Sequence, residues 1–392
     1  MRGANEASGA VEQAAAGRPS RAAVSGSAEV QPVRPTYDGP SVTGLVPALV
    51  GGREARWLPT PVAGATSVVL FVLDGLGWDA VEANASLLPT LRSLEGGPIT
   101  TVAPSTTASA LTSITTGLAP SQHGIVGFRI RVDHSVLNVL SWRSANGRRP
   151  PEPFTVQRHP AFLGRPVPVV TKAEFRSTGF SEAHLRDTRF MGWHAVSSLV
   201  EQCRRLVGAG EPFVYAYYPG IDSVAHAHGL HDGFYAAELA AADRLVADLL
   251  DVLPAQTALL VTSDHGQVHV GPEGWVGLDT LDELVDAYSG DGRFRHLHAR
   301  RGAAKQLLSA AREQHDRHAW VFSRDELLDE GWLGTPVGPA TRRRVGNVVL
   351  AARDPVAFVD PTLPRESQLV SAHGSLTPDE MYVPLLAGRG RA

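Results

Sequence analysis

The sequence predicts a three-layer α/β/α sandwich that is built on a mostly parallel central sheet and carries inserted cap segments. The first observation behind this prediction is that several short apolar runs each end within a few residues of an aspartate. The second is that amphipathic helices separate these runs, as they do in proteins with parallel sheets. With 392 residues, of which 43% are hydrophobic and 19% charged, the chain can bury a large core.

Four apolar segments are predicted to be strands of this sheet, because a continuous apolar run is typical of a strand buried on both faces. They span residues 68–74, 213–218, 258–262 and 382–387. The first three lead into Asp74, Asp222 and Asp264, and parallel sheets bind ligands outside the carboxyl ends of their strands. We therefore expect these carboxylates at one edge of the sheet. For Asp74, capping of the following helix is the alternative.

Three of the predicted helices lie after residue 190. Residues 231–253 place apolar side chains on one stripe with the 3.6-residue period of an amphipathic helix, and Pro254 marks the end. His231 and Asp232 lie where this helix would have its N-cap. Residues 193–207 show a similar stripe, and residues 302–315 form a helical piece within a less regular region.

The chain is expected to consist of a leader, a core and two caps. Residues 1–38 are rich in Ala, Gly, Ser and Pro and poor in large apolar residues, so we expect a disordered leader. Residues 129–190 and 268–345 fit the strand–helix alternation poorly, and we expect them to form caps over the site. The catalytic core is then expected at residues 39–128, 191–267 and 346–392.

The composition argues against several classes of protein. A net charge of −4 does not suggest a protein that coats a nucleic acid polymer. Cys203 is the single cysteine, so neither an intramolecular disulfide nor a sulfur-ligated metal cluster can form. No run approaches the roughly 18 apolar residues of a membrane span, and the N-terminal segment lacks the apolar core of a signal peptide. We expect a cytoplasmic protein that does not contact a membrane.

Six polar residues at or near the predicted strand ends could bind metal ions. They are Asp74, Asp222, His226, Asp264, His265 and His373. Oxygen and nitrogen ligands without thiolates suit zinc, manganese or iron, and six ligands are enough for two ions with three each. Asp222 and His226 are four residues apart, so one helical turn would place both on one face. A lone histidine is more often a core or surface residue, but these paired spacings favour ligation.

A hydroxyl nucleophile is expected close to these ligands. Ser105, Thr106 and Thr107 precede a predicted helix that ends at Gly117, as a helix with a glycine C-cap would. The amide groups and the positive dipole at the start of a helix favour a phosphate group and a developing alkoxide. A plain N-cap is the alternative, and the local pattern does not choose among the three hydroxyls.

The set of motifs resembles the alkaline phosphatase superfamily, and within it the nucleotide pyrophosphatase/phosphodiesterase branch. The resemblance rests on Asp74, the PSTT…TG…P…HGI segment, the DxxxH and SDHG motifs and the late HG. It covers about residues 66–127, 212–229, 257–267 and 371–388 in the order of the family. Each motif is weak alone, and the set is specific.

The resemblance implies a metal-dependent hydrolase of phosphate esters. Thr107 would be the nucleophile and would form a phosphothreonine ester that water then hydrolyses. With Thr107, the residues Asp74, Asp264 and His265 would bind one divalent ion. The other would be bound by Asp222, His226 and His373. Zinc is usual in such enzymes, with manganese as the alternative, and the substrate would be a small phosphate ester or a nucleotide.

One departure from the family pattern concerns substrate binding, and two other functions are the alternatives. The branch often has an asparagine after HGI that contacts the phosphoryl group; Arg129 lies in that region and is predicted to bind substrate phosphate instead. A phosphomonoesterase or phosphomutase on the same scaffold is the second hypothesis, and a non-catalytic binding relative is the third. His123 is expected to be structural and to hold the loop after the nucleophile helix, and His228 is expected to lie around the ligands or on the surface rather than to bind an ion.

Overall fold

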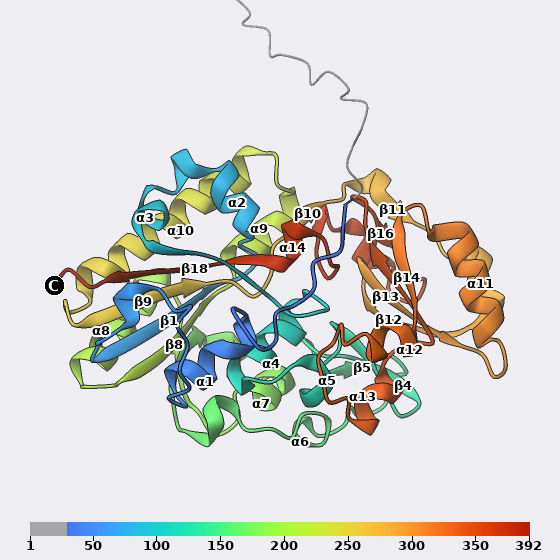
Figure 1. Ribbon diagram of the computed structural model, residues 1–392, viewed down its shortest axis with the longest axis horizontal. Helices are drawn as coiled ribbons and strands as arrows, with labels where there is room; N and C mark the ends of the chain where they lie inside the picture. The colour runs from blue at the N-terminus through green and yellow to red at the C-terminus, as the bar shows by residue number, and fades with distance from the viewer. Residues whose placement is uncertain (1–29) are drawn as a thin grey trace, which may run out of the picture. The chain divides into compact units, whose positions relative to one another are not determined.

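A seven-stranded sheet forms the centre of the fold in the computed structural model, which describes residues 30–392 (Figure 1). Its strand order is β2-β18-β9-β1-β8-β6-β7. The strands are β1 (Ser67–Leu73), β2 (Glu95–Thr100), β6 (Pro168–Lys172), β7 (Arg189–Trp193), β8 (Phe213–Tyr218), β9 (Thr257–Thr262) and β18 (Tyr382–Arg389). The pairs from β9 to β7 are parallel, and β18 is antiparallel to both of its neighbours. The predicted α/β fold with a mostly parallel sheet is confirmed.

Helices cover both faces of this sheet, because successive side chains of a strand point to opposite faces. On one face, Val69, Phe71 and Leu73 of β1 pack with α2 (Trp78–Ala83), α3 (Pro89–Ser93), α8 (Val196–Gly208) and α10 (Gly233–Val252). On the other face, Leu70 and Val72 pack with α1 (Leu45–Leu49), α4 (Thr107–Thr116) and α7 (Gly179–His184). Each fully buried side chain of β1 contributes about 1.5–3 kcal/mol to folding.

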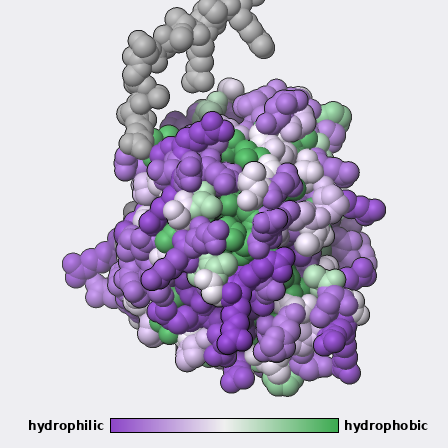
Figure 2. Space-filling view, turned by 90° about the vertical axis from the view of Figure 1, so that its right-hand side faces the viewer, coloured by the Kyte–Doolittle hydropathy of each residue, from purple (hydrophilic) through white to green (hydrophobic). Residues whose placement is uncertain are grey.

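A second, antiparallel sheet of four strands lies beside the first (Figure 1). Its order is β12 (Val285–Asp291), β13 (Phe294–Ala299), β15 (Val348–Ala352) and β14 (Ala319–Ser323). Helix α11 (Ala304–His315) packs Leu307 and Ala311 onto it. The face of the molecule that carries α11 is mostly hydrophilic, with hydrophobic residues visible between the hydrophilic ones (Figure 2).

Short elements connect the two sheets. A small antiparallel sheet consists of three strands, β3 (Arg129–Val132), β4 (Ser135–Asn138) and β5 (Arg143–Ser144). Strand β11 (Trp275–Val276) pairs with β16 (Ala357–Phe358). Strand β10 (Val268–His269) pairs with β17 (Ser371–Ala372), and this pairing brings His373 beside the residues that follow β9. The remaining α-helices are α5 (Pro120–His123), α6 (Pro153–Val156), α9 (Gly220–His228), α12 (Arg324–Asp329), α13 (Pro339–Arg344) and α14 (Pro378–Met381).

The boundaries of the expected caps differ from the structure at two places. Strands β6 and β7 belong to the central sheet, although residues 129–190 were expected to be cap. Strand β15 belongs to the second sheet, although residues 346–392 were expected to be core. The second difference arises because β15 is a buried apolar run, and such a sequence does not show which of the two sheets the strand joins. Residues Pro32–Ala392 group as one compact unit.

The expected leader also ends earlier than residue 38. Residues 1–29 lie outside the described residues. From Val33 onward the chain contacts the core, because Val33 N donates to Leu376 O (2.8 Å) and the Tyr37 hydroxyl donates to Trp332 O (2.8 Å). Because residues 1–38 were judged by their average composition, the contacts of Val33 and Tyr37 with the core were not predicted.

No helix within residues 30–392 is both long enough and apolar enough to cross a membrane. The single cysteine, Cys203, is a free, buried thiol in α8.

Candidate metal centre and active site

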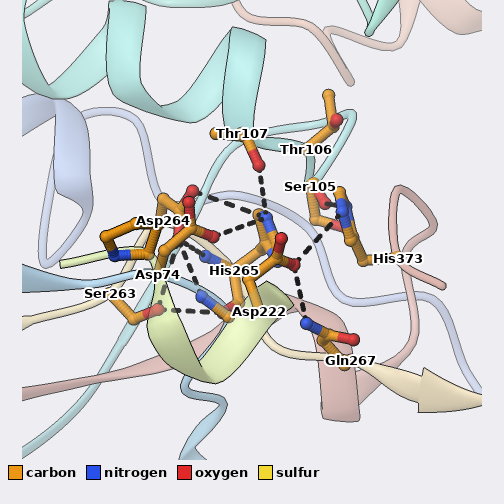
Figure 3. Close-up of polar contacts among 12 residues, drawn as sticks. Asp74, Ser105, Thr106, Thr107, Asp222, Ser263, Asp264, His265, Gln267 and His373 are labelled. Atoms are coloured by element: carbon orange, nitrogen blue, oxygen red, sulfur yellow. Dashed lines mark hydrogen bonds and ion pairs between the residues drawn. The ribbon is translucent and has the colours of Figure 1, made fainter. Parts of the chain in front are cut away.

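The site lies where three neighbouring strands end, as the sequence predicted for parallel strands. Asp74 follows β1, Asp222 lies in the first turn of α9 after β8, and Asp264 follows β9. Because β9, β1 and β8 are adjacent, these carboxylates converge in the described structure (Figure 3). The backbone also joins two of them, since Asp222 N donates to Asp74 O (3.1 Å).

A glycine is required directly after Asp74. Gly75 has a φ of +78°, which side-chain-bearing residues rarely adopt. A Cβ atom here would also lie 3.0 Å from Cα of Asp222 and 2.7 Å from Nε2 of Gln267. The glycine therefore lets the chain turn sharply while the segment that carries Asp222 approaches it closely.

Three histidines at the site share one orientation. In each, Nδ1 bonds a backbone carbonyl, so that Nδ1 carries the proton and Nε2 keeps its lone pair. The bonds join His226 to Ser371 O (2.8 Å), His265 to Gly266 O (3.0 Å) and His373 to Ser105 O (3.1 Å). A metal-binding histidine typically donates its second ring nitrogen to a carbonyl in this way. The geometry therefore fits three Nε2 metal ligands.

The ligand atoms form two overlapping groups in which all atoms lie within 4.8 Å of one another. One group is Asp222, His226 and His373, as the resemblance implied. The other is Asp74, Asp222 and His265. Asp222 is common to both groups, whereas the resemblance implied that it binds one ion only. Asp264 lies next to the second group, with Oδ2 at 3.4 Å from Nε2 of His265.

Two carboxylate oxygens at the site have no hydrogen-bond donor. Asp74 Oδ1 and Asp264 Oδ2 are buried and unpartnered, and they lie 3.5 Å and 3.4 Å from Nε2 of His265. A buried charge without a partner is costly unless it is paired or holds a metal ion. Because oxygen and imidazole ligands suit divalent zinc or manganese, the residues present fit such ions.

The carboxylates also destabilise one another electrostatically. Burial raises the pKa of Asp74 well above its ordinary value, and the charges of Asp264 and Asp222 raise it further. Burial also raises the pKa of Asp264. For Asp222 burial acts in the same direction, but the hydrogen bond with His226 and, when the rings are protonated, the charges of His226 and His373 outweigh it and lower the pKa. Positive charge placed among these groups would relieve the repulsion.

Of the three candidate hydroxyls, that of Thr107 points to the ligand cluster (Figure 3). Thr107 is the first residue of α4, and its Oγ1 lies 3.0 Å from Nε2 of His265. The Ser105 hydroxyl donates to Ser375 O (2.6 Å), and the Thr106 hydroxyl donates to Asp291 Oδ1 (2.7 Å). The helix ends at Thr116, and Gly117 follows it with a φ of +70°, so the predicted glycine C-cap is confirmed.

Three residues of the site were missed in the sequence. The Tyr217 hydroxyl donates to Asp74 Oδ2, and Gln267 Nε2 donates to Asp222 Oδ1 (2.7 Å). Asp291, at the end of β12, accepts the Thr106 hydroxyl. Gln267 lies two residues after His265, so its position was a usable signal. Tyr217 looks like any core aromatic residue of a strand, and Asp291 lies in a region expected to be cap.

Arg129 is engaged in a structural ion pair, which does not support the substrate contact predicted for it. Arg129 is 4% exposed, and its guanidinium pairs with Asp360 and donates from Nη2 to Thr362 Oγ1 (3.1 Å). His123 is structural, because Nδ1 accepts the Ile125 amide (3.1 Å) and Nε2 bonds the Ser113 hydroxyl (2.8 Å).

His228 lies outside the cluster. It is exposed and stacks on Phe234 at 4.1 Å between ring centroids. Its neighbour two residues earlier, His226, faces the ligands instead, as expected for residues that do not share a helix face.

Two cavities meet at Thr107 and Asp222. The larger, of about 280 Å³, also reaches Asp74 and is lined by aromatic and small polar side chains such as Phe175, Phe180 and Tyr217. The smaller, of about 170 Å³, lies toward His373 and contains Phe128, Trp275 and Asp291 among its lining residues. Leu140, 37% exposed, borders both.

Comparison with known proteins places this site in a family context. Residues 68–376 match the model of the family described as type I phosphodiesterase/nucleotide pyrophosphatase. The catalytic subunit of GPI ethanolamine phosphate transferase 3 from Mus musculus is 25% identical over 252 residues, which cover 57% of this chain. That match spans 21% of the relative's own length.

Solved structures share the fold. Murine ectonucleotide pyrophosphatase/phosphodiesterase 5 aligns with a TM-score of 0.61 at 16% identity, over 83% of this chain and 88% of that one. An inactive variant of the same murine protein is solved in complex with AMP. Phosphonoacetate hydrolase from Sinorhizobium meliloti 1021, in complex with phosphonoformate, aligns with a TM-score of 0.59 at 18% identity, over 87% and 93% of the two chains.

The family match spans the segment that carries Thr107 and all six candidate carboxylate and imidazole ligands. The chain therefore belongs to the type I phosphodiesterase/nucleotide pyrophosphatase family of phosphate ester hydrolases, within the alkaline phosphatase superfamily.

Proposed function

We propose that this protein is a two-metal phosphodiesterase that cleaves nucleotide-like diesters with the hydroxyl of Thr107 as nucleophile. The observation that carries the proposal is the direction of the ligand atoms. Three Nε2 lone pairs and two unpartnered carboxylate oxygens belong to one cluster, which the Thr107 hydroxyl contacts at Nε2 of His265 (3.0 Å). The family match supports hydrolysis of a phosphate ester.

Two groups of residues would hold the ions. Asp222, His226 and His373 would bind one, and Asp74, Asp264 and His265 would bind the other, with Asp222 within reach of both groups. We propose zinc, because imidazole and carboxylate ligands without thiolates suit it, with manganese as the alternative. When bound, such ions lower the pKa of a hydroxyl nucleophile and stabilise the oxygen of the leaving group.

The chain's own residues supply the nucleophile and its orientation. Thr107 Oγ1 forms a bond to phosphorus as the bond from phosphorus to the leaving alcohol breaks, and the alcohol takes up a proton. Water then hydrolyses the phosphothreonine ester and restores the hydroxyl. Tyr217 and Gln267 keep Asp74 and Asp222 in place through their hydrogen bonds. The position of Thr107 at the start of α4 provides amide donors for a phosphoryl oxygen.

The two cavities favour a diester over a monoester. Both open on Thr107 and Asp222, so each can take one substituent of a phosphodiester, whereas a monoester has only one. The aromatic lining of the larger cavity suits a planar base or aryl group. The AMP complex of the murine protein supports a nucleotide as the natural class of substrate.

Rates on paired model substrates test this proposal. Zinc-loaded protein is assayed with bis-p-nitrophenyl phosphate and with p-nitrophenyl phosphate, and we expect a higher kcat/KM for the diester. A higher value for the monoester would favour the phosphomonoesterase alternative. No turnover of either ester, with both ions bound, would favour a binding protein.

A further inference from the structure

Thr106, the residue before the proposed nucleophile, does not form the hydrogen bond that its position in the helix predicts. Thr106 is the N-cap of α4, with the extended backbone (φ −133°, ψ 145°) of such residues. An N-cap threonine normally accepts a hydrogen bond from the second or third amide of its helix. Thr106 forms no such bond, and its hydroxyl donates to Oδ1 of Asp291 at 2.7 Å instead.

This arrangement leaves the start of α4 without a side-chain acceptor. Helix geometry gives the amides of Thr107, Ala108 and Ser109 no partner within the helix, and the first amide to find one is that of Ala110, which donates to Thr106 O (2.8 Å). The helix begins at the nucleophile, beside the unpartnered oxygens of the ligand cluster. Free amides at this point would bind an anionic group that approaches Thr107.

Asp291 is held firmly in the position where it accepts the Thr106 hydroxyl. The carboxyl is buried, and both of its oxygens accept the Phe128 amide, at 3.3 Å and 3.2 Å. Two glycines make room for it. A Cβ on Gly127 would lie 3.2 Å from Asp291 Oδ2, and one on Gly374 would lie 3.0 Å from Asp291 Cβ. The second sheet thus places a fixed acceptor beside the nucleophile loop.

We propose that Asp291 is a positioning residue for phosphoryl binding. By accepting the Thr106 hydroxyl, it prevents Thr106 from capping α4 and keeps the amides of Ala108 and Ser109 available to a phosphoryl oxygen of the substrate. Asp291 itself does not touch the phosphoryl group. The inference rests on the proposed function, because it concerns how the same site binds its substrate.

A binding experiment with matched variants tests this role. Calorimetry measures the Kd of inorganic phosphate for metal-loaded protein in the wild type, Asp291→Ala, Asp291→Asn, Thr106→Val and the double variant Asp291→Ala/Thr106→Val. In Asp291→Ala the hydroxyl is free to cap the helix, so we expect Kd to rise about fivefold, the equivalent of an N-cap bond of about 1 kcal/mol. Asp291→Asn keeps an acceptor, so we expect no such rise.

The double variant separates positioning from a merely structural role. Without the Thr106 hydroxyl nothing competes for the amides, so Asp291→Ala is expected to have no further effect on Kd in the Thr106→Val background. The same fivefold rise in both backgrounds would overturn the proposal. So would tighter phosphate binding by both Asp291→Ala and Asp291→Asn, which is what removal of a repelling carboxylate alone predicts.

Two controls keep the outcome decisive. Circular dichroism checks that each variant folds, and Asp291→Leu, which removes the acceptor but keeps the volume, carries the same test if Asp291→Ala does not fold. Wild-type turnover of bis-p-nitrophenyl phosphate is measured in parallel. If the wild type binds phosphate but does not turn over, the proposed function fails, and the Kd values alone decide the role of Asp291.

Discussion

Replacement of Glu380 by glutamine is expected to destabilise the junction between the two sheets. Glu380 forms a two-pronged ion pair with Arg293, with distances of 2.8 Å and 2.9 Å, and both side chains are fully buried. The same carboxylate accepts Ser375 N (2.8 Å) and the Thr377 hydroxyl (2.5 Å). It therefore ties the loop after His373 to strand β13 and its turn.

The size of the effect follows from what glutamine retains. Its single carbonyl oxygen can keep the bonds made by Oε1, while the bonds to Oε2 from Arg293 Nη2 and the Thr377 hydroxyl lose their acceptor. A bond to a charged group is worth about 1.5–3 kcal/mol and a neutral one about 1 kcal/mol. The guanidinium also remains buried without its counter-ion, so we expect a loss of about 3–5 kcal/mol in the free energy of unfolding.

Urea unfolding followed by tryptophan fluorescence measures this loss at a fixed, saturating metal concentration, because bound metal would otherwise change the apparent stability. The matched control is Glu380→Gln combined with Arg293→Met, which removes the unpaired charge. We expect the double variant to be more stable than the sum of the single effects predicts. A single variant within 0.5 kcal/mol of the wild type, or additive effects, would refute the reasoning.

Three further predictions concern the site and its surroundings. Thr107→Ala is expected to abolish ester turnover without changing the bound metal measured by mass spectrometry; turnover equal to that of the wild type would exclude Thr107 as nucleophile. Asp264→Asn is expected to lower both metal content and melting temperature, since metal binding contributes to folding, and an unchanged metal count would make Asp264 structural. Burial lowers the pKa of His184 to about 4, so the unfolded chain binds its proton first and stability falls as pH drops from about 6.5 to 4. His184→Gln is expected to reduce that fall by up to about 3 kcal/mol in urea titrations at several pH values; an identical pH dependence in both proteins would contradict it.

The sequence predicted the structure best where a hydrophobic pattern ends at a residue with a distinctive chemical or conformational property. The apolar run of β1 and its terminal aspartate, the stripe of α10 and the glycine that ends α4 all lie where they were expected. These features depend on neighbours in the chain, which a sequence shows directly. The convergence of Asp74, Asp222 and Asp264 could also be anticipated, because adjacent parallel strands end at one edge.

Features that depend on distant segments were harder to predict. Arg129 has the chemistry of a phosphate ligand, but its pairing with Asp360 comes from a residue 231 positions away. The position of Asp222 between the two ligand groups is likewise a result of how α9 meets β1. Asp291 reaches the nucleophile loop from the second sheet, and its sequence surroundings carry no motif that indicates this.

A crystal structure of zinc-loaded protein with anomalous diffraction at the zinc edge tests the central claim most directly. We expect two zinc peaks beside Thr107, one among Asp222, His226 and His373 and the other among Asp74, Asp264 and His265. Peaks located away from these side chains, or the absence of any zinc peak near Thr107, would contradict the account.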